Sequence, residues 1–324
     1  MINNPLNNKF ELHYHFDDED KTHSMDAFTR NKCEHEILQI ISEITRELEV
    51  NVKVETEAYG EGGLTEIWTF LSSDNGQLTI ILSLLTLTLS RIPLRKTKLE
   101  KKDLQLSIEE KKLNIELLKK ELENKEIPET KLNIENIVIN VSNNYKIIKH
   151  KSNFYKQLYR YPKVKKLSAT KLNENKEKID EPAYVERKDF EKFILETDNL
   201  EPLPDENATI EIISPVLKKG RFKWKGIYDK LGVVIDFSMK DKEFKDEVVD
   251  DGIPFKNGTF IDCILEIERK IDDLGNIFNS NYSVLTVLRQ HDETVSIETP
   301  QGKKYRKQKE AEKMQLKLFN DNLD

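Results

Sequence analysis

The strongest constraint on this chain is an uncharged apolar segment inside a highly charged sequence. Residues 75–90 carry no charge, whereas 34% of all 324 residues are charged. The surrounding stretch, QLTIILSLLTLTLSRIPLRK at residues 77–96, ends in a cluster of basic side chains. Because so much apolar surface is unfavourable in water, the segment must lie in a lipid bilayer or in a protein core.

The length of the segment does not decide between these environments. Its sixteen uncharged residues would form a helix of about 24 Å, whereas a bilayer's hydrocarbon core is about 30 Å thick. Residues 91–95 can extend the span if Arg91 and Arg95 reach the interface. A buried helix and, from the alternating TLTLS, a strand stay open. We expect a membrane helix, with the other two as alternatives.

Hydroxyl side chains follow one another along this segment at helical spacing. The intervals between them are 4, 3 and 4 residues, which places them within an arc of roughly 60° on a helix. Small hydroxyls allow helices to approach closely, and slightly splayed helices would line a polar pore with them. The predicted pore-lining residues are Thr79, Ser83, Thr86 and Ser90.

The pattern before the apolar segment predicts a small α+β module at residues 1–60. Residues 10–16 alternate between apolar and polar side chains, which indicates a half-buried strand. Residues 24–48 keep helical spacing, and residues 51–56 alternate again. A β-α-β unit is therefore expected.

Two helical regions and a connecting region are expected after this module. Residues 61–94 would hold an amphipathic helix at 64–71 and the candidate transmembrane helix. Residues 95–127 carry a 4/3 apolar repeat from Leu104 to Leu122, which favours a coiled-coil stalk over a single packed helix. Residues 128–182 would contain a strand at 132–141, a basic arm and a linker.

The last third of the chain predicts a β-rich domain at residues 183–300 and a charged tail at 301–324. Short alternating runs are separated by turn signals at Lys219-Gly220, Asn257-Gly258 and Leu274-Gly275. The expected class is thus α+β, ending in a β-rich domain. The expected strands cover residues 208–217, 222–228, 232–238, 259–268 and 281–289, with a helix near 241–249.

A basic and aromatic arm covers residues 144–172, with nine Lys or Arg residues and no acid. Such a segment can bind single-stranded nucleic acid or a nucleotide, because cations neutralise phosphates and rings stack on bases. It can also bind anionic lipid, or pair with acidic helices of its own chain. The predicted ligand-binding residues are Lys149, Lys151, Tyr155, Lys156, Tyr159, Arg160, Lys163, Lys165 and Lys166.

The sequence offers no catalytic motif, and we expect neither an enzyme nor a cofactor. Four histidines near Cys33 lack a recognised metal-ligand spacing, so no metal site is predicted. The acids of residues 262–270 fit one face of an ordinary half-buried strand. Trp224 looks exposed, but one aromatic side chain makes no site.

Residues 64–172 combine the hydroxyl-lined helix, the heptads and the Lys/Tyr arm. This arrangement resembles membrane channel effectors of bacterial anti-phage defence, of the Hailong type. The resemblance implies a symmetric homo-oligomeric ion channel, such as a tetramer, in the bacterial inner membrane with its C-terminal domain cytoplasmic. It further implies closure by a single-stranded oligodeoxyadenylate from a partner nucleotidyltransferase, and contact with membrane lipid.

A second interpretation places the whole chain in the cytoplasm. The stalk would assemble a coiled-coil oligomer, the apolar segment would be buried, and the basic arm would hold nucleic acid. Both interpretations expect an anionic ligand, and they differ in the environment of residues 77–94.

Overall fold

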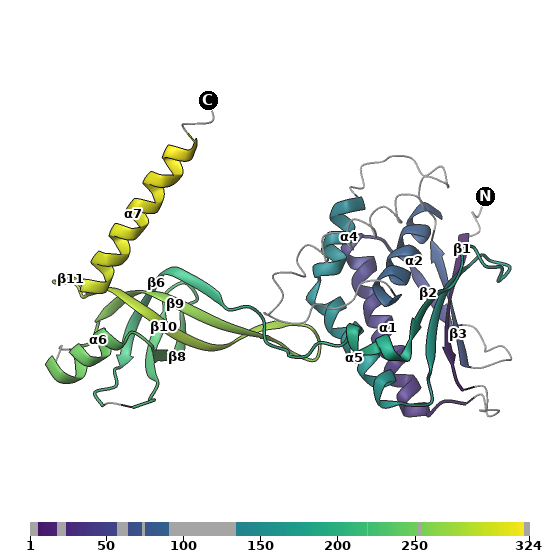
Figure 1. Ribbon diagram of the computed structural model, residues 1–324, viewed down its shortest axis with the longest axis horizontal. Helices are drawn as coiled ribbons and strands as arrows, with labels where there is room; N and C mark the ends of the chain where they lie inside the picture. The colour runs from purple at the N-terminus through teal and green to yellow at the C-terminus, as the bar shows by residue number, and fades with distance from the viewer. Residues whose placement is uncertain are drawn as a thin grey trace. The chain divides into compact units, whose positions relative to one another are not determined.

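The chain is an α+β protein whose described residues fall into two units (Figure 1). Unit 1 comprises Met1–Asp198 and Ile271–Asn276, and unit 2 comprises Asn199–Lys270 and Ile277–Asp324. The computed structural model describes residues 6–17, 24–56, 64–72, 75–90, 134–218, 220–251 and 255–320. The predicted stalk at 95–127 lies outside these ranges.

Unit 1 is built on a five-stranded antiparallel sheet with the order β2-β3-β1-β4-β5. The alternating pattern at residues 10–16 belongs to its central strand, and the apolar side chains of that strand are fully buried. The strands are β1 (Leu6–His15), β2 (Lys53–Thr56), β3 (Leu64–Ser72), β4 (Lys166–Leu172) and β5 (Ala183–Glu186).

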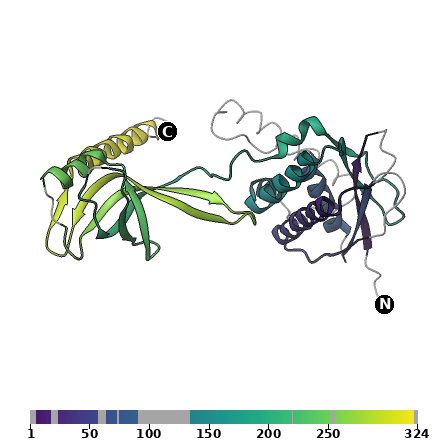
Figure 2. The same ribbon diagram turned by 90° about the horizontal axis from the view of Figure 1, so that it is seen from below.

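The helices of unit 1 gather on one face of this sheet (Figure 2). They are α1 (Ala27–Glu47), α2 (Asn75–Ser90), α4 (Ile134–Asn143), α5 (Tyr145–Arg160) and the short 3-10 helix η1 (Arg187–Phe193). Side chains cap two of them, because Asp26 accepts a hydrogen bond from Thr29 N and Asn144 accepts from Lys146 N. Helix α5 packs along α1, and η1 packs against α5.

The apolar segment is helix α2, and it is buried inside unit 1. It contacts β1, β3 and β4 on one side and α1 and α4 on the other. Its Leu and Ile side chains from Leu78 to Leu89 are all 5% exposed or less. Within the described ranges no helix is both long and apolar enough to cross a bilayer. In this structure the segment is a buried helix of unit 1, which is one of the environments left open by its sequence.

Two other elements differ from the sequence prediction. Residues 64–71, expected as an amphipathic helix, form strand β3 between β1 and β2. Residues 132–141, expected as a strand, overlap helix α4, where Val138 and Val141 are buried at a helical interval. Tertiary packing overrides local propensity in both cases. The strand, helix and strand expected in residues 1–60 are present as β1, α1 and β2, and β3 lies between the two strands in the sheet.

Unit 2 confirms all five predicted strands and the helix near residues 241–249. The tail also forms a helix over most of its length. The elements are β6 (Leu203–Ser214), β7 (Trp224–Tyr228), β8 (Val233–Met239), α6 (Lys242–Asp246), the π-helical turn η2 (Glu247–Asp251), β9 (Phe260–Ile271), β10 (Ile277–His291), β11 (Ser296–Glu298) and α7 (Pro300–Asn320).

Strands β6 to β10 close into a barrel. The sheet order is β11-β10-β8-β7-β6-β9, and β9 and β10 also pair with each other. Strand β10 runs parallel to β8, and α6 lies in the connection between β8 and β9. A five-stranded Greek-key barrel with this strand order and this helix has the topology of the OB-fold. Its interior is filled by aromatic and aliphatic side chains, including Trp224, Phe237 and Leu265.

A buried carboxylate, Asp241, joins three elements of unit 2. It accepts hydrogen bonds from Phe244 N at the start of α6 (3.1 Å), from Val287 N of β10 (2.8 Å) and from Gln301 Nε2 of α7 (3.2 Å). Since removing the carboxylate leaves the buried Val287 amide without this acceptor, we expect Asp241→Ala to cost about 3 kcal/mol of unfolding free energy.

Urea denaturation followed by Trp224 fluorescence measures this loss, in a Trp68→Phe background that removes the other tryptophan. The matched control is Asp236→Ala, because Asp236 is exposed on β8 and lies 3.9 Å from Lys225 Nζ. This control should change stability by less than about 0.5 kcal/mol. Equal stability of the two variants would show that Asp241 does not join these elements.

Candidate nucleic-acid interface

The loop between β6 and β7, with the first residues of β7, is a strongly basic surface segment of the barrel. Residues 218–225 contain five Lys or Arg residues and no acid. Two large apolar side chains flank these cations in the open, since Leu217 is 62% exposed and Phe222 is 58% exposed. The described cations are Lys218, Arg221, Lys223 and Lys225, and the fifth, Lys219, lies outside the described residues.

A buried tryptophan and a hydrogen bond hold this basic loop in place. Trp224, at the start of β7, is fully buried against Phe237, Phe244 and Phe255, so the sequence reading of Trp224 as exposed was wrong. Lys245 of α6 donates a hydrogen bond to the carbonyl of Gly220.

Gly220 itself allows Phe222 to fold over the loop backbone. It has a φ of +148°, and a Cβ there would lie 2.7 Å from Cε2 of Phe222. A residue with a side chain would displace the ring, so the glycine fixes where the exposed aromatic ring is presented.

The outer face of β7 and β8 continues the surface next to the loop. Lys225 lies opposite Asp236, and Ile227 lies opposite Val234. The Lys225 ammonium is 3.9 Å from the Asp236 carboxylate, which is a loose ion pair on an exposed surface. The face therefore offers aliphatic area from Ile227 and Val234 beside the Lys225–Asp236 pair. In OB-folds, the second and third strands and the loop before them form the usual ligand surface, and here these are β7, β8 and the basic loop.

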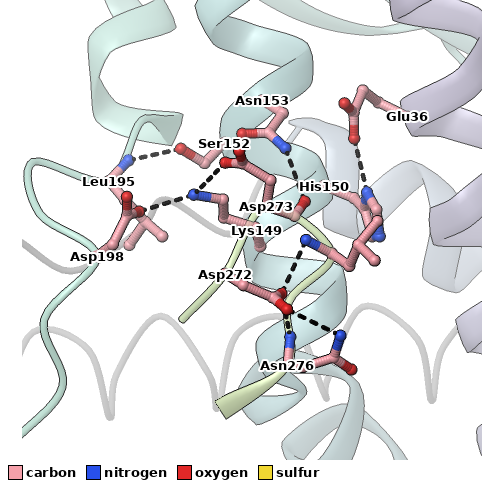
Figure 3. A network of polar contacts seen from close by, with 11 residues as sticks. Glu36, Lys149, His150, Ser152, Asn153, Leu195, Asp198, Asp272, Asp273 and Asn276 are labelled. Atoms are coloured by element: carbon pink, nitrogen blue, oxygen red, sulfur yellow. Dashed lines mark hydrogen bonds and ion pairs between the residues drawn. The ribbon is translucent and has the colours of Figure 1, made fainter. Parts of the chain in front are cut away.

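The residues predicted to bind a ligand do not form such a surface. Lys149, Lys151 and Tyr155 of α5 are each 2% exposed or less. Figure 3 shows Lys149 between two aspartates, with Nζ 2.8 Å from Asp198 Oδ1 and 3.2 Å from Asp273 Oδ1. Burial by itself would lower the pKa of Lys149, but the hydrogen bonds to both aspartates raise it above its ordinary value.

Lys151 and Tyr155 are both buried in the core of unit 1. The pKa of Lys151 falls to about 7 because its ammonium is desolvated. The Tyr155 ring stacks on Phe193, with ring centroids 4.5 Å apart, and its hydroxyl donates to the Leu89 carbonyl of α2. These two side chains are thus parts of the interior of unit 1.

The remaining predicted ligands are half-buried or exposed, and several of them contact other groups of unit 1. Lys165 Nζ lies 3.2 Å from Asp17 Oδ2, and Tyr159 donates to Glu191 Oε1 at 3.1 Å. Lys163 donates to the Ser24 carbonyl, and Lys166 lies over the Tyr184 ring at 4.7 Å. The last two lie on α5, where Lys156 is half-buried and Arg160 is exposed.

Neighbouring residues of the arm show the same pairing. His150 Nδ1 is 2.6 Å from Glu36 Oε2 of α1 (Figure 3), and Lys146 Nζ is 3.7 Å from Glu43 Oε1. These contacts are the ones expected if the arm pairs with acidic groups of its own chain, which is the last of the three interpretations given above.

The predicted pore-lining hydroxyls also lie within unit 1. Thr79 and Ser83 are buried, and Ser83 Oγ accepts a hydrogen bond from Lys171 Nζ at 3.2 Å. Thr86 and Ser90 are half-buried and donate to carbonyls one turn earlier, to Leu82 O at 2.9 Å and to Thr86 O at 2.6 Å. Such bonds to the preceding turn satisfy the hydroxyls of Thr86 and Ser90 inside the helix.

Two histidines stack on the sheet of unit 1. The rings of His13 and His15 lie 4.0 Å apart, and His15 Nε2 is 2.8 Å from Ser168 Oγ. Burial, followed by the nearby His13 and Lys166, lowers the pKa of His15 to about 4. Among the residues that the structure describes, no three His, Cys, Asp or Glu side chains come together in a way that would hold a metal ion.

A buried carboxylate, Glu66, lies on β3 beside helix α1. It is 2% exposed, and Arg30 Nε donates to its Oε1 at 2.9 Å. Burial raises the pKa of Glu66 to about 7, and the Arg30 guanidinium opposes this rise only in part. Because the folded carboxyl holds its proton more tightly than the unfolded one, Glu66 contributes less stability as the pH rises from 4.5 through about 7.

We therefore expect Glu66→Gln to gain stability relative to the wild type as the pH rises from 5 to 8, by on the order of 2 kcal/mol. The contribution of His15 to stability has the opposite pH dependence, because it falls as the pH drops from 6.5 towards about 4. His15 is common to both proteins, so it cancels in the difference. Urea unfolding followed by Trp68 fluorescence tests this, with exposed Glu55→Gln as the control. A constant difference across this pH range would contradict it.

Comparisons of the chain with protein-family models, with curated proteins and with solved structures gave no match. The sequence pattern predicts a turn at Lys219-Gly220 and a strand at 222–228 in this region, and it predicts no ligand-binding role for the basic loop. The signal that would have found it is the run of cations without an acid around Phe222.

Proposed function

We propose that the barrel of unit 2 binds single-stranded nucleic acid through the β6–β7 loop and the outer face of β7 and β8. One observation carries the proposal. The loop at the ligand-binding position of an OB-type barrel carries exposed Lys218, Arg221 and Lys223 on either side of the exposed Phe222 in the sequence.

The chemistry of these side chains suits an unpaired strand. Lysine and arginine release counterions when they contact phosphates, so they provide affinity that depends on salt. An exposed aromatic ring stacks on a base only when that base is free of its partner strand, and such stacking contributes about 1–3 kcal/mol per base. A duplex would offer its phosphates to the cations but no base to Phe222.

This proposal keeps the anionic nucleic-acid ligand expected from the sequence and assigns it to different residues. The ion-channel function and the resemblance to Hailong-type effectors depended on residues 64–172. In that range α2 and its hydroxyls lie in the core of unit 1, and buried members of the basic arm pair internally. This geometry does not support a pore built from α2, whereas the barrel surface supports binding. An oligodeoxyadenylate from a nucleotidyltransferase partner is one ligand that this surface would accept.

Fluorescence anisotropy with the full chain tests the proposal. The probes are labelled 20-nucleotide oligo(dA), oligo(dT) and mixed-sequence strands, and a duplex of the mixed sequence. We expect the single strands to bind at least 10-fold more tightly than the duplex. We also expect the three or four phosphate contacts of the loop site to contribute between about −2 and −3 to the slope of log K against log salt, at about 0.7 each. Tighter binding of the duplex, or no binding at micromolar protein in 50 mM salt, would refute the proposal.

A further inference from the structure

Helix α7 carries a second basic cluster that the proposed loop site does not use. Residues 303–309 contain five Lys or Arg residues and no acid. They fall in the first turns of the helix, directly after Gly302. A run of cations on a solvent-exposed helix often binds no ligand. The position of this run on unit 2 therefore decides whether it can contact one.

The start of α7 is fixed against strand β10. Thr299 Oγ1 donates to the Val287 carbonyl at 2.6 Å and accepts from Gly302 N at 2.9 Å. A Cβ at Gly302 would lie only 2.0 Å from the Leu288 carbonyl oxygen, so the helix begins in direct contact with the strand. The cations that follow are therefore held at a defined position on unit 2.

The cations of α7 fall on two sides of the helix. Arg306 pairs with Glu298 of β11, and Lys309 pairs with Glu206 of β6, so these two face the barrel. Lys303, Lys304 and Lys307 lie on the other side at the helical intervals that bring side chains together, and all three are exposed. Within the described part of the chain, none of these three has an ion-pair partner.

Helix α6 lies between the basic loop and α7. Its Lys245 contacts the Gly220 carbonyl of the loop, and Asp241 at its N-terminus contacts Gln301 of α7. Because Asp241 and Lys245 are four residues apart, the two contacts are separated by roughly one helical turn, or about 6 Å along the helix axis. Lys242 of α6 is exposed in this interval, next to one exposed acid, Glu243.

We infer that the outer face of α7, formed by Lys303, Lys304 and Lys307, is a second phosphate-contact surface. A single strand held by the β6–β7 loop would continue past α6 onto these lysines. The inference rests on the proposed function, and it specifies the ligand as a strand longer than the loop site by itself can hold. Site sizes of about 4–16 nucleotides per OB barrel leave room for such an extension.

The test compares a short strand with a long one on the full chain. The variant replaces Lys303, Lys304 and Lys307 with glutamine, and the probes are labelled oligo(dT) of 6 and 20 nucleotides. We expect the 20-mer to bind about 10-fold more weakly, with a salt slope shallower by about 2, because three contacts at about 0.7 each are lost. The 6-mer should change less than 2-fold. The matched control is Arg306→Gln, which removes a cation from the barrel-facing side and should leave both affinities within 2-fold.

Each other outcome overturns the inference in a distinguishable way. Unchanged affinity for both probes would refute the α7 surface while the loop site stands. An equal loss for the 6-mer and the 20-mer would show that the lysines belong to the first contact and do not extend it. Binding that survives replacement of the loop cations but fails in the α7 variant would refute the proposed function together with the extension. Circular dichroism of the variant confirms that α7 and the barrel stay folded.

Discussion

Replacing Lys218, Arg221 and Lys223 with glutamine is expected to weaken binding of a 20-nucleotide single strand by about 100-fold at 100 mM salt. Each lost phosphate contact removes on the order of 1 kcal/mol. The slope of log K against log salt should become shallower by about 2. Fluorescence anisotropy over a range of salt concentrations measures both quantities.

A charge-matched variant separates local contacts from net charge. Lys32, Lys53 and Lys188 are exposed on unit 1, and replacing them with glutamine removes the same three positive charges. This control should bind within about 3-fold of the wild type. Phe222→Ala should cost about 10-fold with an unchanged salt slope, because it removes stacking and keeps the cations. Equal losses in the two triple variants would show that the binding depends only on net charge.

Leu85→Asp is expected to unfold unit 1. Leu85 is fully buried in α2, and the variant would place a carboxylate among aliphatic side chains without a partner. The combined loss of packing and cost of burying a charge exceeds about 4 kcal/mol, which is a large part of the stability of an ordinary domain. Circular dichroism and the fluorescence of Trp68 would report the loss, and Leu85→Ala should cost about 2–5 kcal/mol.

The neighbouring Thr86→Ala is the control for this prediction. Thr86 is half-buried, and its hydroxyl donates to the preceding turn of its own helix, so its removal should cost less than about 1 kcal/mol. If Leu85→Asp keeps the wild-type stability, α2 does not lie in the core of unit 1. The environment of α2 would then be open again, and a bilayer would be one of the alternatives.

The strands of unit 2 could be predicted because each is a short alternating run bounded by turn residues. Gly258 and Gly275, for example, both adopt positive φ angles where the sequence indicated turns. The closure of the barrel could not be predicted, because it depends on the parallel pairing of β10 with β8. Those strands are far apart in the sequence, and nothing local specifies their register.

The errors in unit 1 have a common cause. Strand β3 lies inside the sheet with a run of buried residues from Glu66 to Phe70, so it shows no alternation by which a strand is recognised. Helix α2 is apolar on all sides because unit 1 surrounds it, and such a helix has the same composition as a short membrane span. Periodicity reports only how many sides of an element are buried, and not what buries them.

Charge patterns have a similar limit, because local sequence does not show which charged groups pair in the fold. The basic arm was recognised correctly as cationic, but its partners lie far away in the sequence, as with Lys149 and Asp198 or His150 and Glu36. Local sequence therefore could not show that these cations are internally paired. The loop around Phe222 was within reach of the sequence, since its cations have no acid nearby. Its place on the barrel is the observation that suggests a role in binding.

Photocrosslinking tests the central claim most directly. A 20-nucleotide strand that carries 5-iododeoxyuridine is bound to the full chain and irradiated, and the crosslinked residues are identified by mass spectrometry. Binding through the barrel predicts adducts within residues 217–225, with Phe222 foremost, and their loss when Phe222 is replaced by alanine. Adducts confined to unit 1, with none on this loop, would contradict the assignment of nucleic-acid binding to the barrel.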